Sequence, residues 1–133
     1  MFCLFFTPLV FAKSIHIAVA SNFLLPMKQL AAEFEQVSGH KIIISSASTG
    51  KLFAQLMHGA PYDLFFSADG TRADLLVKKG LAKKSSVYAR GQIVFVAKGR
   101  EAESTSWQCR SVLNSLAASK LAIATPKTAP YGL

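Results

Sequence analysis

Short apolar runs alternate with stretches of helical periodicity along most of this sequence. Residues 14–21 alternate apolar and polar side chains and residues 41–45 form a β-branched run, and both patterns are typical of strands. Between them, apolar residues from Met27 to Val37 recur at helical spacing, and Gly39 is expected to end that helix. Further strands are expected at 62–69, 91–99 and 120–126, and further helices around 52–57, 71–79 and 112–116. The alternation predicts an α/β protein with a mostly parallel sheet covered by helices on both faces.

Acidic residues in and after the expected strand 62–69 have structural and catalytic interpretations. Thr71 and Asp74 have the spacing of a capping box, which predicts a helix start at this point. Asp63 and Asp69 are six residues apart, so on one strand they would share a face. Paired catalytic carboxylates would have to be exposed in a cleft, and no nucleophile with a matching base accompanies them. The sequence therefore gives little support for an enzyme.

The first twelve residues, MFCLFFTPLVFA, are almost wholly apolar. This run is too short to cross a bilayer, which takes roughly 20 residues. It suits the apolar core of a secretory signal, and Val10 and Ala12 suit cleavage before Lys13. We therefore expect residues 1–12 to be the remnant of a signal peptide and the protein to be exported. The basic residues that normally open a signal are missing, which indicates a start further upstream or a damaged signal. A buried first strand is the alternative interpretation.

The charge of the chain favours anionic partners. Fifteen Lys and Arg against seven Asp and Glu give a formal net charge of +8, which suits nucleic acid, an acidic membrane surface or a small oxyanion. The basic residues are spread out, with no arginine-rich stripe interleaved with aromatics, so we expect no nucleic-acid binding. His16, His40 and His58 are isolated in the sequence, and we expect no metal-cation site.

The segment SSASTGKLFAQL, from Ser45 to Leu56, resembles a nucleotide-binding P-loop at one point. Gly50 and Lys51 match the core of that motif, G-x-x-x-x-G-K-[ST]. The first glycine of the motif falls on Ser45 and its metal-binding hydroxyl falls on Leu52. Because two defining positions fail, the segment is not predicted to bind a nucleotide.

Two polar turns remain, each between an expected strand and an expected helix. Ligands of parallel sheets bind at this edge, and a helix N-terminus offers free N–H donors and the positive end of a dipole. Ser21, Ser48 and Thr49 add hydroxyl donors, and Gly50 would allow close approach of the backbone. Such a set of neutral donors suits a small, fully deprotonated, doubly charged oxyanion. The alternative is that Ser21 and Ser48 are ordinary N-cap residues.

Four segments, in order, resemble the periplasmic molybdate-binding proteins of ABC importers. They are IAVASNFLLPMKQLAAEF, SSASTGKLFAQLMHGAPYDLFFSAD, LVKKGL and TPKTAPYG. The resemblance implies a two-lobed fold of the periplasmic-binding-protein type, with molybdate or tungstate held between the lobes. It implies that Ser21 and Thr49 each donate a hydroxyl and a backbone N–H to the anion, and that Tyr131 donates its backbone N–H. By the same resemblance Asn22, Ser48 and Gly50 support the site, and Asp63, Ser67 and Asp69 are structural.

The resemblance also implies a domain organisation. Residues 13–91 would form the first lobe without its C-terminal elements, and 92–133 a crossing strand and the start of the second lobe. Chains of this family are longer, so the second lobe is expected to be incomplete and binding by this chain alone weak or absent. We expect a monomer that takes no cofactor and delivers the anion to a membrane ABC permease. A non-binding remnant of such a protein and a binder of another tetrahedral oxyanion are the alternatives.

Overall fold

Three parallel strands form the centre of the described structure. The computed structural model describes residues 13–92, 125 and 127–130. Strands β1 (Ser14–Ala20), β2 (Lys41–Ala47) and β3 (Leu64–Phe66) pair in the order β2-β1-β3. Both pairings with the central strand are parallel. The predicted α/β architecture with a parallel sheet is confirmed for this part of the chain.

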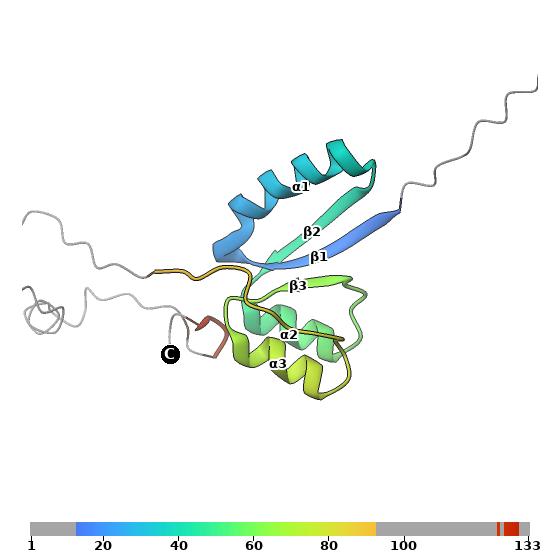
Figure 1. The fold of residues 1–133 in the computed structure, drawn as a ribbon. Helices are drawn as coiled ribbons and strands as arrows, with labels where there is room; N and C mark the ends of the chain where they lie inside the picture. The colour runs from blue at the N-terminus through green and yellow to red at the C-terminus, as the bar shows by residue number, and fades with distance from the viewer. Residues whose placement is uncertain (1–12, 93–124, 126, 131–133) are drawn as a thin grey trace, which may run out of the picture.

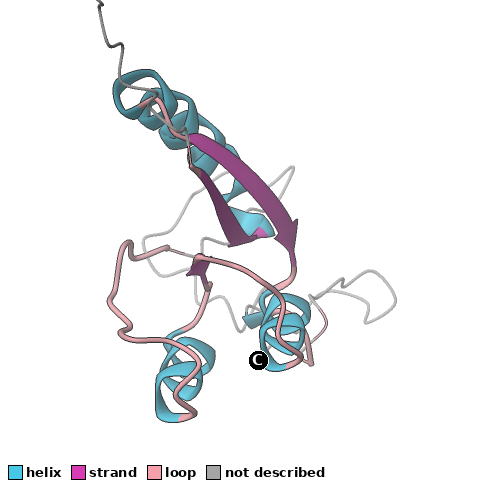
Figure 2. Cartoon of the chain, turned by 90° about the vertical axis from the view of Figure 1, so that its right-hand side faces the viewer, coloured by secondary structure: helices cyan, strands magenta, loops and turns pink. Residues whose placement is uncertain are grey.

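Helices cover both faces of this sheet (Figures 1 and 2). A short 3-10 helix, η1 (Ser21–Phe23), leads into α1 (Leu24–Ser38), which lies on one side of the strands. Helices α2 (Thr49–Met57) and α3 (Gly70–Lys78) lie together on the other side.

The core follows the alternation of side chains along β1. Ile17 and Val19 pack with Met27 of α1 in one buried cluster. Ala18 and Ala20, which point to the other face, are also buried, and α2 contacts β1. Small side chains on that face allow α2 to approach the strand closely. The carboxyl end of β1 is therefore packed against helices on both faces of the sheet.

The end of α1 agrees with the sequence prediction. Gly39 follows the last helical residue with a φ of 69°, and its N–H donates to the Glu35 carbonyl at 3.0 Å. A left-handed residue of this kind is a common helix stop, and glycine adopts it without steric cost. The Glu35 carboxylate also accepts the Ile42 N–H at 2.6 Å, which ties the end of α1 to the start of β2.

The segment around β3 differs from the prediction. The strand covers Leu64–Phe66, not 62–69, so Asp63 and Asp69 do not share a strand face. Asp63 forms two hydrogen bonds with His16 of β1. Its Oδ2 accepts the His16 N–H at 2.8 Å, and its own N–H donates to the His16 carbonyl at 2.9 Å. The predicted capping box at Thr71 is wrong, because Asp69 caps α3 by accepting the Arg72 N–H at 2.8 Å. The helix can therefore begin one residue earlier than expected, at Gly70.

The segment after α3 returns across the end of β3. Tyr88 packs edge-on against Phe23 and Phe66, with ring centroids 5.0 and 5.1 Å apart, and its hydroxyl donates to the Ser67 carbonyl at 3.0 Å.

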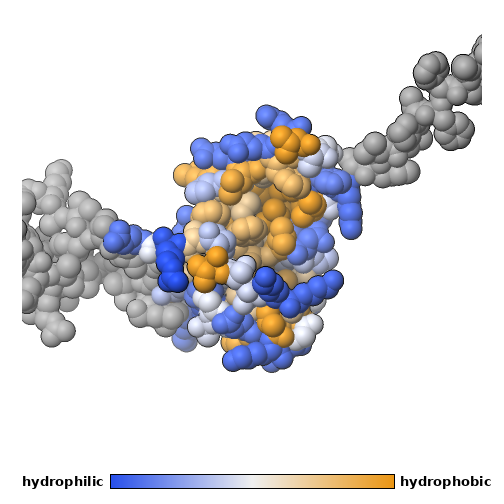
Figure 3. All heavy atoms as spheres, in the orientation of Figure 1, coloured by the Kyte–Doolittle hydropathy of each residue, from blue (hydrophilic) through white to orange (hydrophobic). Residues whose placement is uncertain are grey.

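A band of apolar residues lies across the face shown in Figure 3. Residues 1–12 and the helix expected around 112–116 lie outside the described residues. The strand expected at 91–99 also does so, except for residues 91 and 92, which belong to no regular element. The strand at 120–126 does so except for Thr125, which belongs to no regular element.

Candidate functional site

A serine follows each of the three strands at the same edge of the sheet. Ala20 pairs with Ala47 in the parallel register, so Ser21 and Ser48 leave neighbouring strands side by side. Val19 pairs with Phe66, which brings Ser67 to the same edge beyond β3. Because the carboxyl ends of parallel strands are the usual ligand-binding edge, these turns define the candidate site.

The turn after β1 presents exposed polar side chains. Ser21 and Asn22 are the first two residues of η1, and both are exposed. The N-cap position of η1 is Ala20, and no side chain caps this short helix. The alternative prediction that Ser21 is an N-cap residue is therefore wrong. Its hydroxyl is not used to cap a helix.

The turn after β2 presents buried hydroxyls. Ser48 occupies the N-cap position of α2, as the alternative interpretation expected, but its side chain makes no capping hydrogen bond. Its hydroxyl oxygen is buried and has no hydrogen-bond partner within the part of the chain that the structure describes. A buried polar group without a partner is costly and usually has an explanation outside the bare fold. A ligand or ordered water that accepts a hydrogen bond from this hydroxyl would be such an explanation.

Thr49 opens α2 and is 1% exposed. Its Oγ1 accepts the Ala68 N–H at 3.3 Å, which joins the start of α2 to the end of β3. A threonine hydroxyl has one donor and two acceptor sites. This bond uses an acceptor site, and it orients the hydroxyl while leaving its hydrogen available to a ligand.

Gly50 contacts a distant part of the chain. Its N–H donates to the Thr128 carbonyl at 3.1 Å. The sequence suggested that this glycine lets a ligand approach the backbone, and in the structure the backbone of Lys127 and Thr128 occupies the space beside it. Nothing in the local sequence around Gly50 indicates this partner, because the pairing joins two segments far apart in the chain.

Ser67 is held by its own turn. Its hydroxyl donates to the Asp69 carbonyl at 2.7 Å and accepts the Asp69 N–H at 3.2 Å. Together with the bond from Asp63 to His16 and the Asp69 cap of α3, this agrees with the structural roles expected for these three residues. Tyr131, the third expected ligand-binding residue, lies outside the described residues.

The described residues offer neutral donors at this edge and no obvious cation site. Across the described ranges, no three His, Cys, Asp or Glu side chains gather closely enough to hold a metal ion. Neither do these ranges contain a helix with the length and apolar character needed to cross a membrane. Hydroxyls and helix N-terminal amides at adjacent turns can bind an anion that accepts hydrogen bonds.

Comparison with known proteins adds a family and several relatives. The family model described as bacterial extracellular solute-binding protein matches residues 15–133. The molybdate-binding protein ModA of Azotobacter vinelandii is 40% identical over 124 residues, covering 91% of this chain and 48% of that protein. ModA of Rhodobacter capsulatus is 33% identical, covering 86% of this chain and 45% of the relative. The chain thus spans about half the length of the curated relatives that it matches.

Two solved structures match half of this chain. The periplasmic molybdate-binding protein of Azotobacter vinelandii matches with 42% identity and a TM-score of 0.49, over 50% of this chain and 29% of that one. The substrate-binding domain of a putative molybdenum ABC transporter from Clostridium difficile matches with 26% identity and the same TM-score of 0.49, over 50% of this chain and 30% of the other.

Proposed function

Because this chain belongs to the family of bacterial extracellular solute-binding proteins, we propose that it binds molybdate and delivers it to the membrane permease of an ABC importer. The relatives named as molybdate-binding proteins support this choice of anion. Tungstate, which has the same tetrahedral shape and charge, is proposed to bind at the same site. The proposed location is the periplasm, and the proposed role is binding without catalysis.

One observation carries the proposal: hydroxyls at the carboxyl edge of the sheet are not used for capping. The register places Ser21 beside the start of α2, and the buried hydroxyl of Ser48 lacks a partner among the described residues. Thr49 is oriented by the Ala68 N–H. Molybdate accepts hydrogen bonds and donates none, so it fits a set of hydroxyl and amide donors, which a protonated anion would fit less well.

The proposed roles of the residues follow from these contacts and from the sequence resemblance. Ser21 and Thr49 would donate their hydroxyls and backbone amides to the anion, and Tyr131 would donate its backbone N–H. Asn22, Ser48 and Gly50 would support the two turns. The first lobe is proposed to span 13–91, and 92–133 to form the crossing strand and the start of the second lobe. The protein is proposed to act as a monomer without a cofactor or nucleic acid.

Crystals grown with tungstate test the site directly. The proposal expects an anomalous tungsten peak within hydrogen-bond reach of the Ser21 and Thr49 hydroxyls. Calorimetry should detect heat with molybdate and tungstate that phosphate does not give. Ser21→Ala should weaken the binding, whereas Ser14→Ala, which removes an exposed hydroxyl at the far end of β1, should not. A peak elsewhere, or an equal response to phosphate, would refute the proposal.

A further inference from the structure

The segment 127–130 is held against the first lobe at two points. Two successive carbonyls face the N-terminal ends of two helices: Thr128 accepts the Gly50 N–H of α2 at 3.1 Å, and Lys127 accepts Nη2 of Arg72 in α3 at 3.4 Å. The segment is also folded on itself, because the Ala129 N–H donates to the Thr125 carbonyl at 2.9 Å. A preformed turn is thus fixed beside the residue that follows Thr49.

Gly50 leaves room for this turn by lacking a side chain. A Cβ built there would lie 3.0 Å from the Thr128 Cα, 3.2 Å from the Thr128 oxygen and 3.3 Å from the Lys127 oxygen. All three contacts are to backbone atoms, which cannot move aside as the end of a side chain can. A side chain at position 50 therefore requires the turn to shift by a few tenths of an ångström.

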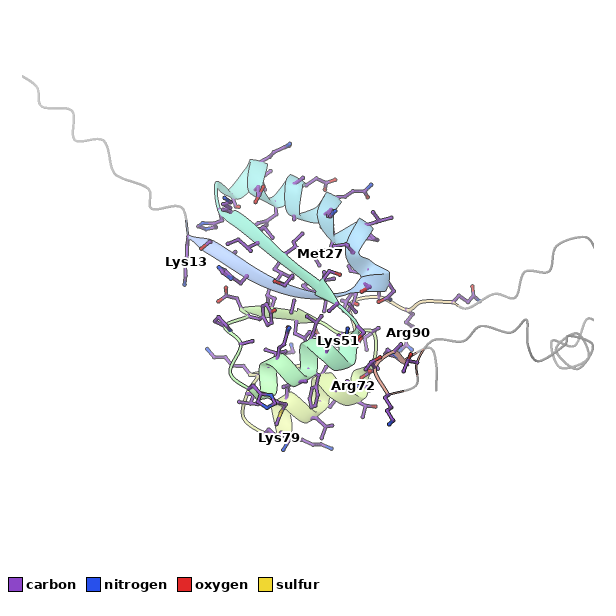
Figure 4. All side chains as sticks on the ribbon, turned by 180° about the vertical axis from the view of Figure 1, so that it is seen from behind. Lys13, Met27, Lys51, Arg72, Lys79 and Arg90 are labelled. Atoms are coloured by element: carbon purple, nitrogen blue, oxygen red, sulfur yellow. The ribbon has the colours of Figure 1, made fainter. Side chains whose placement is uncertain are left out.

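Arg72 is oriented before it meets the turn. Its Nη1 donates to Asp69 Oδ2 at 2.5 Å, and its own backbone N–H donates to the other oxygen of the same carboxylate at 2.8 Å. The side chains of Arg72 and Asp69 are 19% and 16% exposed. The planar guanidinium is held by the residue that caps its own helix, and its Nη2 donates to the Lys127 carbonyl. Arg72 is labelled beside the start of α3 in Figure 4.

We propose that Gly50 and Arg72 together hold the segment 127–130 next to Thr49, at the edge of the anion site. We call this pair of residues the latch. This inference rests on the proposed function. The Gly50 N–H already donates to the Thr128 carbonyl. Gly50 would therefore support the site by positioning the segment 127–130, and not by donating to the anion. A prearranged second segment shields the anion from water and lowers the ordering cost of binding.

Substitutions at the two points test the latch in the whole chain. Gly50→Ala should raise the Kd for molybdate roughly tenfold, as expected for overpacking of a close backbone contact. Arg72→Gln should raise it less, about two- to fivefold, since it removes one long hydrogen bond. Arg72→Lys should resemble Arg72→Gln, because lysine lacks the fork that joins Asp69 and Lys127. Gly70→Ala is the matched control: it adds the same methyl in the first turn of α3, where nothing lies within 4 Å.

A second readout needs no anion. Hydrogen exchange of the amide at residue 50, followed by NMR without molybdate, should be faster in Gly50→Ala and Arg72→Gln and unchanged in Gly70→Ala. Equal Kd values for wild type and Gly50→Ala would overturn the latch while leaving the proposed function intact. Unchanged exchange would overturn it as well. If the wild type binds no molybdate although exchange still rises, the proposed function falls, and with it the role of the latch in affinity.

Discussion

Replacing Thr49 with valine separates its two hydrogen-bonding roles from its packing. Valine has nearly the shape of threonine, with a methyl in place of the hydroxyl, so the buried space stays filled. Thr49 is 1% exposed, and its Oγ1 accepts the Ala68 N–H at 3.3 Å. Thr49→Val therefore removes the acceptor of Ala68 and the hydroxyl donor proposed for molybdate.

The expected effects differ for folding and binding. Loss of a partner for a buried amide costs about 1–3 kcal/mol, and the long bond and half-buried Ala68 put Thr49→Val near the lower end, at about 1 kcal/mol. For a chain of 133 residues that corresponds to a fall in Tm of roughly 3–4 °C. A hydrogen bond to a charged ligand contributes about 1.5–3 kcal/mol, so the Kd for molybdate should rise about 10- to 100-fold.

Thr49→Ser is the matched control, because it keeps the hydroxyl and removes the buried methyl. It should lose about 1 kcal/mol of the free energy of unfolding and keep a Kd close to that of the wild type. Urea denaturation followed by circular dichroism gives the stabilities, and calorimetry gives the affinities. Binding by Thr49→Val as tight as in the wild type, or binding by Thr49→Ser as weak as in Thr49→Val, would refute the reasoning about the hydroxyl.

Three substitutions test the contacts that hold the site in place. Leu52→Ala should cost about 2–5 kcal/mol in urea denaturation, since Leu52 is 1% exposed and its loss leaves a cavity between α2 and the sheet; a loss below 1 kcal/mol would contradict this packing. Asp69→Ala should lower the free energy of unfolding by about 1–2 kcal/mol through the lost N-cap and speed exchange of the Arg72 amide, and unchanged exchange would show that another group caps α3. Glu35→Ala should cost about 1 kcal/mol by leaving the Ile42 N–H without its acceptor, whereas Glu35→Gln, which keeps an acceptor oxygen, should be closer to the wild type.

Much of the fold could be predicted because its signals are local. The alternation in β1, the helical spacing in α1 and the stop at Gly39 each depend on neighbours within a few residues, and all three are confirmed. The predicted strand 41–45 is also confirmed, but it extends to Ala47 into the expected polar turn, because pairing with β1 continues to Ala20. Tertiary pairing decided the end of that strand, and it has no local signal.

The errors near β3 have a similar cause. Asp63 looked like part of a strand, but it serves β1 through its side chain and backbone from just outside β3. Thr71 had the spacing of a cap, yet Asp69 accepts the Arg72 N–H and takes that position. For the site, the residue types predicted hydrogen-bond donors at the two turns. They did not predict the contact between Gly50 and Thr128, since neither residue type indicates its partner.

The bond between Arg72 and Lys127 joins residues 55 positions apart in the chain, and this separation has a consequence for folding. The three described strands all end by residue 66, so the sheet can pair without the segment 127–130. The contacts of Gly50 and Arg72 join this sheet to residues far along the chain, and closing contacts across such a separation costs entropy. Within the described residues, these contacts beside the anion site are therefore expected to form after the sheet and to open before it on warming.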